Sequence, residues 1–302
     1  MEGVYTLGVF ALAMFFGSYL AGLIPLAFTM SESRIRRISI FGAGLLVGTA
    51  LSVIIPEGVE VLYSARFGTY RYFAVLREQQ QQPQLEFDEE HDDSWIHKAI
   101  GFSLIIGFLV MLLIDETFRA ATSGERSRFG LTATIGLIVH AAADGVALGS
   151  ASATNRADVQ FIVFLAIMLH KAPAAFGLVS FLLVEGLERV RVRRHLLAFS
   201  LSAPLTAMLT FYIIAMFGSN SSLSSHSFTG ILMLFSAGTF LYVATVHVLP
   251  ELVLNDYQLM PTSSNSGHSH SSGVGGNIKE LSALIVGALF PAIIASGHSH
   301  SH

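Results

Sequence analysis

The chain has 302 residues, of which 52% are hydrophobic and only 13% are Asp, Glu, Lys or Arg. Soluble domains are about 25% charged, so this chain has too little charge to cover a water-exposed surface. Its net charge of −4 excludes a basic surface for nucleic acid, and the absence of cysteines excludes disulfides and thiolate metal sites. Together with a mean hydropathy of +0.61, the composition predicts a membrane protein.

Eight apolar stretches are candidate membrane spans, because crossing about 30 Å of hydrocarbon takes roughly 20 apolar residues. In chain order they are Val4–Phe28, Ile38–Pro56, Ala99–Ile114, Leu131–Ala153, Val159–Val184, Leu196–Gly218, Phe228–Pro250 and Leu281–Ser296. Trp95 and Lys98 precede the third stretch as interfacial anchors. We therefore expect an all-α polytopic protein in the lipid bilayer, with one transmembrane domain over residues 1–302.

The basic residues are divided unequally between the two sides of these spans. Eleven follow spans one, three, five and seven: Arg34, Arg36, Arg37, Arg119, Arg126, Arg128, Arg189, Arg191, Arg193, Arg194 and Lys279. Five lie on the opposite side: Arg66, Arg71, Arg77, Lys98 and Arg156. Because positive residues stay cytoplasmic, both termini are predicted to be lumenal or extracellular.

Two connections between spans are polar and low in complexity. Residues 77–93 are acidic and rich in glutamine, and we expect a mobile lumenal loop there. Residues 255–277 form a Ser/Gly-rich segment on the cytosolic side that contains His268 and His270. Short histidine-rich tracts hold metal weakly, so this pair is a candidate for metal gathering, the alternative being a solvated loop without metal.

The second and seventh spans resemble each other. Residues 43–57 and 237–251 align without a gap, with identical residues at Ala43/Ala237, Gly44/Gly238, Ala50/Ala244, Pro56/Pro250 and Glu57/Glu251. Two such segments five spans apart cross the membrane in opposite directions, which is the arrangement of an inverted repeat in transporters. Coincidence between two spans rich in small residues is the alternative.

Four ionisable side chains fall near the middle of spans four and five. His140 and Asp144 are four residues apart and share one helix face, and His170 and Lys171 follow in the next span. Each such group costs about 2.5–3.5 kcal/mol at the bilayer centre, which favours a function. Since the two spans are antiparallel neighbours, we expect the two histidines to meet at the same depth.

Two imidazoles and one carboxylate suit Zn²⁺ with one coordination position open, and they also suit Fe²⁺ or Mn²⁺. The alternative is a buried hydrogen-bonded network that only fixes the register of the helices. Lys171 has two interpretations: a fixed cation in place of a second metal ion, or a partner that pairs with Asp144 and makes insertion tolerable.

Four segments in order resemble the ZIP (Zrt-, Irt-like) divalent-metal transporters. They are HAAADG from His140, HKAPAA from His170, GAGLLVGTALSVIIPEG from Gly42 and FSAGTFLYVATVHVLPE from Phe235. The resemblance implies eight helices with both termini outside the cytosol, an inverted repeat of helices 1–3 and 6–8, and a homodimer. It also implies movement of Zn²⁺, in some members iron or manganese, into the cytosol by a helix bundle that slides or rocks against a scaffold.

By the same resemblance, His140, Asp144 and His170 are the ligands of the transport site. His247 is a candidate auxiliary ligand, the alternative being a histidine near a helix end that only reaches toward the membrane surface. The chain departs from the common pattern at Ala141, Lys171 and Ala174, where many members have Asn, a carboxylate, and Glu or His. A single metal site with Lys171 as a fixed cation therefore fits this sequence better than a two-metal centre.

Glu57 and Glu251 adjoin the prolines of the two similar segments. Given the predicted topology, Glu57 lies at the lumenal end of span two and Glu251 at the cytosolic end of span seven. They are candidate carboxylates at the two mouths of the pathway, with ordinary solvation of helix ends as the alternative.

The function predicted from the sequence is zinc transport into the cytosol by alternating access, with Zn²⁺ as substrate and no prosthetic group. An intramembrane zinc hydrolase is a weaker alternative, because there is no HExxH motif and no spare carboxylate near the site to act as a base. A receptor that senses metal or another ligand is a third possibility. From the resemblance we expect the Golgi or the plasma membrane.

Overall fold

The structure is a computed structural model that describes residues 2–27, 31–64, 93–121, 128–153, 157–217, 226–248 and 275–298. Their secondary structure is helical: α1 (Glu2–Ala27), α2 (Glu32–Thr49), η1 (Ala50–Ile54), α4 (Asp93–Ala121), α5 (Arg128–Ser152), α6 (Ala157–Val184), α7 (Arg189–Phe217), α8 (His226–Tyr242), η4 (Val243–Val248) and α10 (Gly275–His298). The two η segments are π-helical and continue their neighbouring α-helices. Eight helices in this part of the chain are long and apolar enough to cross a membrane, which confirms the predicted class.

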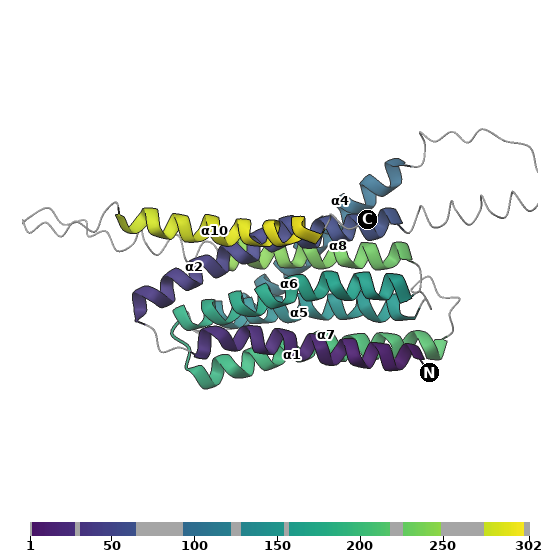
Figure 1. Cartoon of the computed structure of the whole chain (residues 1–302), viewed down its shortest axis with the longest axis horizontal. Helices are drawn as coiled ribbons and strands as arrows, with labels where there is room; N and C mark the ends of the chain where they lie inside the picture. Colours follow the sequence, from purple (N-terminus) through teal and green to yellow (C-terminus); the bar gives the residue numbers. More distant parts are fainter. Residues whose placement is uncertain are drawn as a thin grey trace, which may run out of the picture.

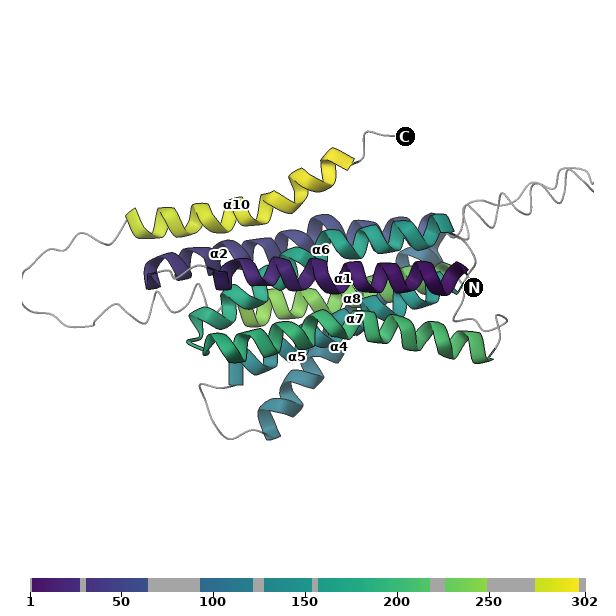
Figure 2. The same cartoon turned by 60° about the horizontal axis from the view of Figure 1, so that its bottom comes forward.

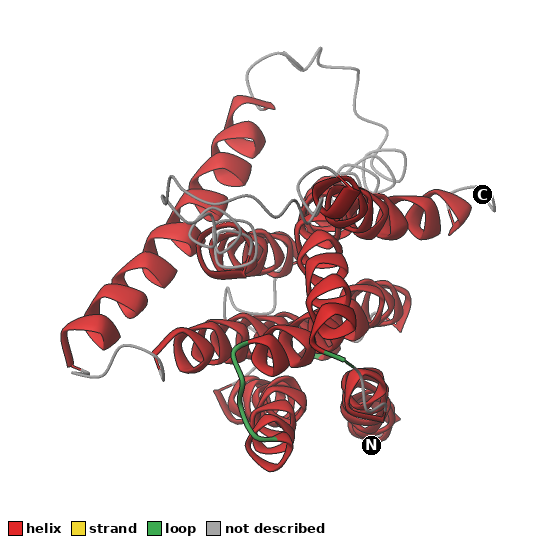
Figure 3. Ribbon diagram, turned by 90° about the vertical axis from the view of Figure 1, so that its left-hand side faces the viewer, coloured by secondary structure: helices red, strands yellow, loops and turns green. Residues whose placement is uncertain are grey.

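The helices form a bundle with α5 and α6 in the middle. α1 and α7 pack on one side of this central pair, and α2 and α8 pack on the other side (Figure 1). α4 and α10 lie on opposite flanks (Figure 2), and most helices are seen nearly end-on when the bundle is viewed from one end (Figure 3). The spans that contain α2, α5 and α8 are the most buried in the bundle, and the span of α6 comes next.

The second span is longer than predicted. A helix continues through residues 55–64, so the span covers Ser33–Ser64 and Pro56 lies in its interior. Proline has no backbone N–H and in a regular α-helix clashes with the carbonyl four residues back. In η1 the N–H of Ile55 bonds to the carbonyl of Ala50, five residues back, and this wider turn accommodates the proline. The helix therefore continues to Ser64 and does not end at Pro56 as predicted, and Glu57 lies within it.

Other boundaries moved by smaller amounts. The third and sixth spans begin earlier, at Trp95 and Arg189, because their polar flanks are already helical. Asp93 begins α4, where an acidic residue near a helix N-terminus is favourable, and Gly275 begins α10. The predicted loops 77–93 and 255–277 are thus shorter at these ends, and their remaining residues lie outside the described part.

Glycines allow α2 and α10 to approach closely. A Cβ on Gly44 would overlap the backbone carbonyl of Leu284, and a Cβ on Gly287 would overlap that of Phe41. Small residues at helix interfaces let backbones come together in membranes, where packing rather than hydrophobicity drives association. These two glycines therefore fix the register of α2 against α10.

The same arrangement occurs between α8 and α4. A Cβ on Gly238 would overlap the carbonyl of Leu104, and one on Gly107 would overlap that of Phe235. Gly238 is the residue that aligns with Gly44 in the sequence similarity noted above. One polar contact is added here: the hydroxyl of Tyr242 donates a hydrogen bond of 2.7 Å to the buried carboxylate of Asp115.

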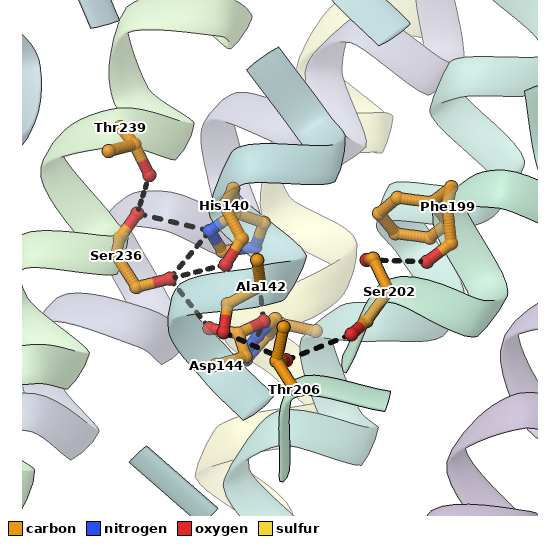
Figure 4. Close-up of polar contacts among 9 residues, drawn as sticks. His140, Ala142, Asp144, Phe199, Ser202, Thr206, Ser236 and Thr239 are labelled. Carbon is orange, nitrogen blue, oxygen red and sulfur yellow. Dashed lines mark hydrogen bonds and ion pairs between the residues drawn. The ribbon is translucent and has the colours of Figure 1, made fainter. Parts of the chain in front are cut away.

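Close packing also joins α5 to α7. A Cβ on Gly145 or Gly149 would meet the carbonyls of Ala203 and Ala207. The Thr206 hydroxyl lies 3.1 Å from the carbonyl of Ala142 and donates to it (Figure 4). α5 is thereby held at a fixed depth in the bundle, which positions its polar residues.

Candidate metal site

The central helices bring three predicted residues together. His140 and Asp144 lie one turn apart on α5, and His170 comes from the antiparallel α6, which stays helical through Pro173. His140, Asp144 and His170, here called the His–Asp–His cluster, have one potential ligand atom each within 4.8 Å of one another. Their exposed fractions are only 1%, 2% and 1%, so the expectation that the histidines meet at one depth is confirmed.

The spacing within the cluster suits a tetrahedral ion. Oδ2 of Asp144 is 3.0 Å from Nε2 of His170 and 3.4 Å from Nε2 of His140. Two ligands that each lie 2.0–2.1 Å from a tetrahedral Zn²⁺ are about 3.3 Å apart. The carboxylate oxygen is therefore already at nearly the distance from each ring nitrogen that a shared zinc ion requires.

Ser236 of α8 connects the cluster to a third helix. Its hydroxyl is 2.6 Å from Oδ1 of Asp144 and 2.7 Å from Nδ1 of His140 (Figure 4). Its backbone carbonyl is 3.0 Å from the same Nδ1. A carbonyl only accepts hydrogen bonds, so we assign the proton of neutral His140 to Nδ1, which leaves Nε2 with a lone pair for a metal.

Sequence reasoning missed Ser236, because it considered only ionisable residues. The available signal was its position: Ser236 immediately precedes the segment of α8 that resembles α2, among small residues that face a neighbouring helix. Its contacts are of the kind that orient metal-binding histidines, whose second ring nitrogen donates to a protein oxygen.

Lys171 is buried beside the cluster but points elsewhere. Its side chain is 1% exposed, and its ammonium has no hydrogen-bond partner among the described residues. It lies 4.7 Å from the centre of the Phe199 ring of α7, within the range of a cation–π interaction. A direct ion pair with Asp144, one of the two interpretations of Lys171, does not form in the described part, because His170, His140 and Ser236 surround that carboxylate.

Two of the three positions that distinguish this chain from the family pattern are occupied by small, buried residues. Ala141 and Ala174 are both completely enclosed, and neither has a side chain that can bind a metal. Among the residues described, the three members of the His–Asp–His cluster form the one group of carboxylates and imidazoles with metal-binding spacing.

Of the remaining predicted site residues, only Glu57 has a described side chain. Glu57 is half-buried and close enough to His170 and Glu60 to interact with both electrostatically. His247 belongs to η4, with its side chain outside the described part. Glu251, His268 and His270 also lie outside the described residues.

Eight apolar helices around a buried His–Asp–His cluster define a polytopic membrane protein with a candidate metal site at its centre. The sequence profile described as ZIP Zinc transporter matches residues 4–129 and 123–295. The chain therefore belongs to the ZIP zinc transporter family, and it is a transporter rather than an enzyme.

Similar proteins cover the chain from end to end. It is 46% identical to zinc transporter ZIP9-A of Xenopus laevis over 99% of this chain and 100% of that protein. It is 45% identical to zinc transporter ZIP9 of Micropogonias undulatus over the same shares. With zinc transporter ZIP9 of Macaca fascicularis it shares 55% identity over 55% of this chain and 67% of that protein.

Proposed function

We propose that this protein carries Zn²⁺ through the membrane into the cytosol and that the His–Asp–His cluster is its transport site. The observation that carries the proposal is the buried Asp144 carboxylate oxygen at 3.0 and 3.4 Å from two imidazole nitrogens. Ionisable groups inside a membrane protein are costly and mark ion pathways. A three-ligand site with an open fourth position binds zinc without enclosing it permanently.

Fe²⁺ and Mn²⁺ are secondary candidates for the same site. Two histidines and one carboxylate also form non-haem iron sites, and carboxylate oxygens suit Mn²⁺. Both imidazoles favour zinc over manganese, and the close 3.0 and 3.4 Å spacing favours a small tetrahedral coordination shell.

The orientation we propose places both termini in the lumen or outside the cell. α1 begins and α10 ends toward the same end of the bundle, whereas α2, α7 and α10 begin at the other end (Figure 1). The starts of α2 and α7 carry seven arginines (Arg34, Arg36, Arg37, Arg189, Arg191, Arg193 and Arg194), which marks that end as cytosolic. The family resemblance suggests the Golgi or the plasma membrane, which fluorescence imaging of a tagged chain would test.

Alternating access requires two states of similar energy, and an inverted repeat supplies them. The repeat that we propose relates the first three spans to the last three. Gly44 in α2 and Gly238 in α8 support it, because each meets a carbonyl of its flanking helix, α10 or α4, in the same way. Each is also followed by a π-helical segment and a Pro–Glu pair.

Glu57 is the carboxylate that we place on the lumenal approach to the site, because it is half-buried on the residue 55–64 helix and interacts with His170. Glu251 would serve the cytosolic mouth, with His247 as an auxiliary ligand, by their sequence positions. His268 and His270 would gather metal in the loop between α8 and α10.

A homodimer is the assembly that we propose from the family resemblance. The flanking helices α4 and α10 are the least buried spans and expose large apolar side chains such as Phe102, Ile106 and Phe290. Cross-linking of membranes that contain two differently tagged copies would test this assembly.

Zinc flux in proteoliposomes tests the proposed function. The wild type should take up Zn²⁺, whereas His140→Ala and His170→Ala should reduce uptake at least about a hundredfold at matched protein, because a three-ligand site loses most of its affinity with one imidazole. His195→Ala, which removes a histidine of α7 outside the cluster, is the matched control and should transport normally. Near-normal flux in either cluster variant would contradict the site assignment.

A further inference from the structure

The charge of the metal-free His–Asp–His cluster affects the step in which the empty site becomes accessible again from the side where zinc is taken up. After releasing zinc, a carrier must expose its empty site to the other side again, so the charge of the empty site travels back through the membrane interior. An uncompensated charge at the bilayer centre is costly. Asp144 supplies one negative charge, and the two imidazoles supply none in their neutral, metal-binding form.

Lys171 provides the balancing charge. It is completely buried on α6, directly after the ligand His170, and therefore stays within the same rigid helix as that ligand. Consecutive residues of an α-helix are about 100° apart, so the ammonium points away from the metal ligands and toward Phe199. It interacts with Asp144 electrostatically without occupying a ligand position.

The ring of Phe199 explains how this cation is retained. Phe199 is completely buried on α7, and its face is 4.7 Å from the ammonium, which has no hydrogen-bond partner among the described residues. An aromatic face stabilises an ammonium most strongly where water is excluded, and it does so without a competing negative charge. The ammonium therefore remains available to offset Asp144.

We propose that Lys171 is a built-in counter-charge that makes the metal-free transport site electrically neutral, so that the empty carrier returns without a second metal ion or another counter-cation. This inference rests on the proposed zinc transport and adds its driving force: net uptake proceeds down the electrochemical gradient of Zn²⁺ alone. Lys171 is thus a positioning and charge-setting residue, because it does not touch the transported ion.

The experiment compares two modes of transport in proteoliposomes held at zero membrane potential with potassium and valinomycin. Net uptake of radioactive Zn²⁺ into zinc-free vesicles requires the empty site to return in every cycle. Exchange of radioactive Zn²⁺ against internal unlabelled Zn²⁺ returns the site loaded. The ratio of the exchange rate to the net rate therefore measures the empty-site step, independently of how much active protein is present.

Lys171→Met removes the charge and keeps a long apolar side chain, so the empty site carries the uncompensated charge of Asp144. We expect its ratio of exchange to net uptake to rise about tenfold or more over the wild type. The free-energy cost of one such charge on insertion scales corresponds to a rate factor of roughly 70 to 400. Lys171→Arg retains the charge and should keep the wild-type ratio. Lys98→Met makes the same change at an exposed lysine of α4 and should also keep it.

The outcomes separate the two proposals. An unchanged ratio in Lys171→Met, or equal losses of exchange and net uptake, would mean that Lys171 serves folding alone and would overturn the inference while zinc transport stands. Absence of both exchange and net uptake in the wild type would overturn the proposed function and this inference with it. A raised ratio in Lys171→Met but not in Lys171→Arg supports the counter-charge.

Discussion

The helix pairs α2–α10 and α4–α8 are packed alike and differ in chemistry. In each pair a glycine of the inner helix and a glycine of the outer helix meet backbone carbonyls at the same register. Where α8 has Ser236, the aligned position of α2 is Gly42, and where α8 has Tyr242, the aligned position is Gly48. Both pairs therefore pack closely, but only the α4–α8 pair, through Ser236, also contacts His140 and Asp144 of the candidate metal site.

The same difference extends to the outer helices. Asp115 of α4 accepts a hydrogen bond from Tyr242 at the point where α8 becomes π-helical. In the other pair, Gly48 directly faces the backbone of Ala288 in α10, with no room for a side chain. At this level the α4–α8 pair is thus joined by packing and by a polar contact. The polar contact of the α2–α10 pair is an ion pair of 3.1 Å between Arg36 and Glu280, near the start of both helices.

Gly44→Val and Gly238→Val should have the largest effects on stability and should be similar to each other. Each added side chain would overlap a backbone carbonyl, which cannot move aside like a flexible side chain. We expect a loss of about 3 kcal/mol or more, the upper part of the usual range for overpacking. Thermal unfolding in detergent measures it, with Gly101→Val, where the Cβ meets nothing within 4 Å, as control. A large effect in only one pair would contradict the shared packing.

Ser236→Ala should weaken zinc binding roughly ten- to a hundredfold, the usual cost of removing a group that orients a metal ligand. The change removes the hydroxyl contacts to His140 and Asp144 without adding volume. Competition with a chelating dye on the purified protein measures the affinity. Ser180→Ala is the matched control, because that buried serine bonds only to its own helix and faces Gly42. Equal affinities in both variants would contradict the orienting role.

Tyr242→Phe should reduce stability by about 1 kcal/mol, the net value of one buried hydrogen bond, and should leave zinc affinity within about twofold. Thermal unfolding and the same dye competition give the two values. Tyr212→Phe, at an exposed tyrosine of α7, should change neither. A tenfold loss of affinity in Tyr242→Phe would show that the polar contact of α4 and α8 extends its influence to the metal site.

The double variant His268→Ala/His270→Ala should have the smallest effect. These residues lie in the sequence between α8 and α10, and a short histidine-rich tract holds metal only weakly. We expect the initial rate of zinc uptake to stay within about twofold of the wild type at saturating zinc, with a change confined to low zinc concentrations. Complete loss of flux would place the transport pathway through this loop.

The sequence was sufficient to predict the eight spans and the meeting of the His–Asp–His cluster, because apolar length and a four-residue spacing are local properties. Val159–Val184 was predicted with its observed bounds. The end of the second span was not predicted correctly. Pro56 would end the helix only if the turn before it could not widen. Whether it widens depends on η1 and on the helices packed around it, which the local sequence does not reveal.

Two features of the site depend on distances that no spacing rule supplies. Ser236 is 92 positions from Asp144 in the chain, and its hydroxyl touches that carboxylate only because α5 and α8 pack together. Lys171 follows His170 directly, yet its ammonium lies over the ring of Phe199 of α7 rather than against Asp144. Neutral hydroxyls and aromatic faces give no signal in a search for charged residues.

The π-helical segment η1 also sets the azimuth of every residue that follows it. Relative to an uninterrupted α-helix, one additional residue per wide turn rotates the remaining helix by about 100°. The direction in which residues 55–64, including Glu57, point therefore depends on the additional residue within Ala50–Ile54. A deletion of one residue in η1 would leave the span long enough to cross the membrane but would turn the Glu57 side chain about a quarter-circle around the helix axis.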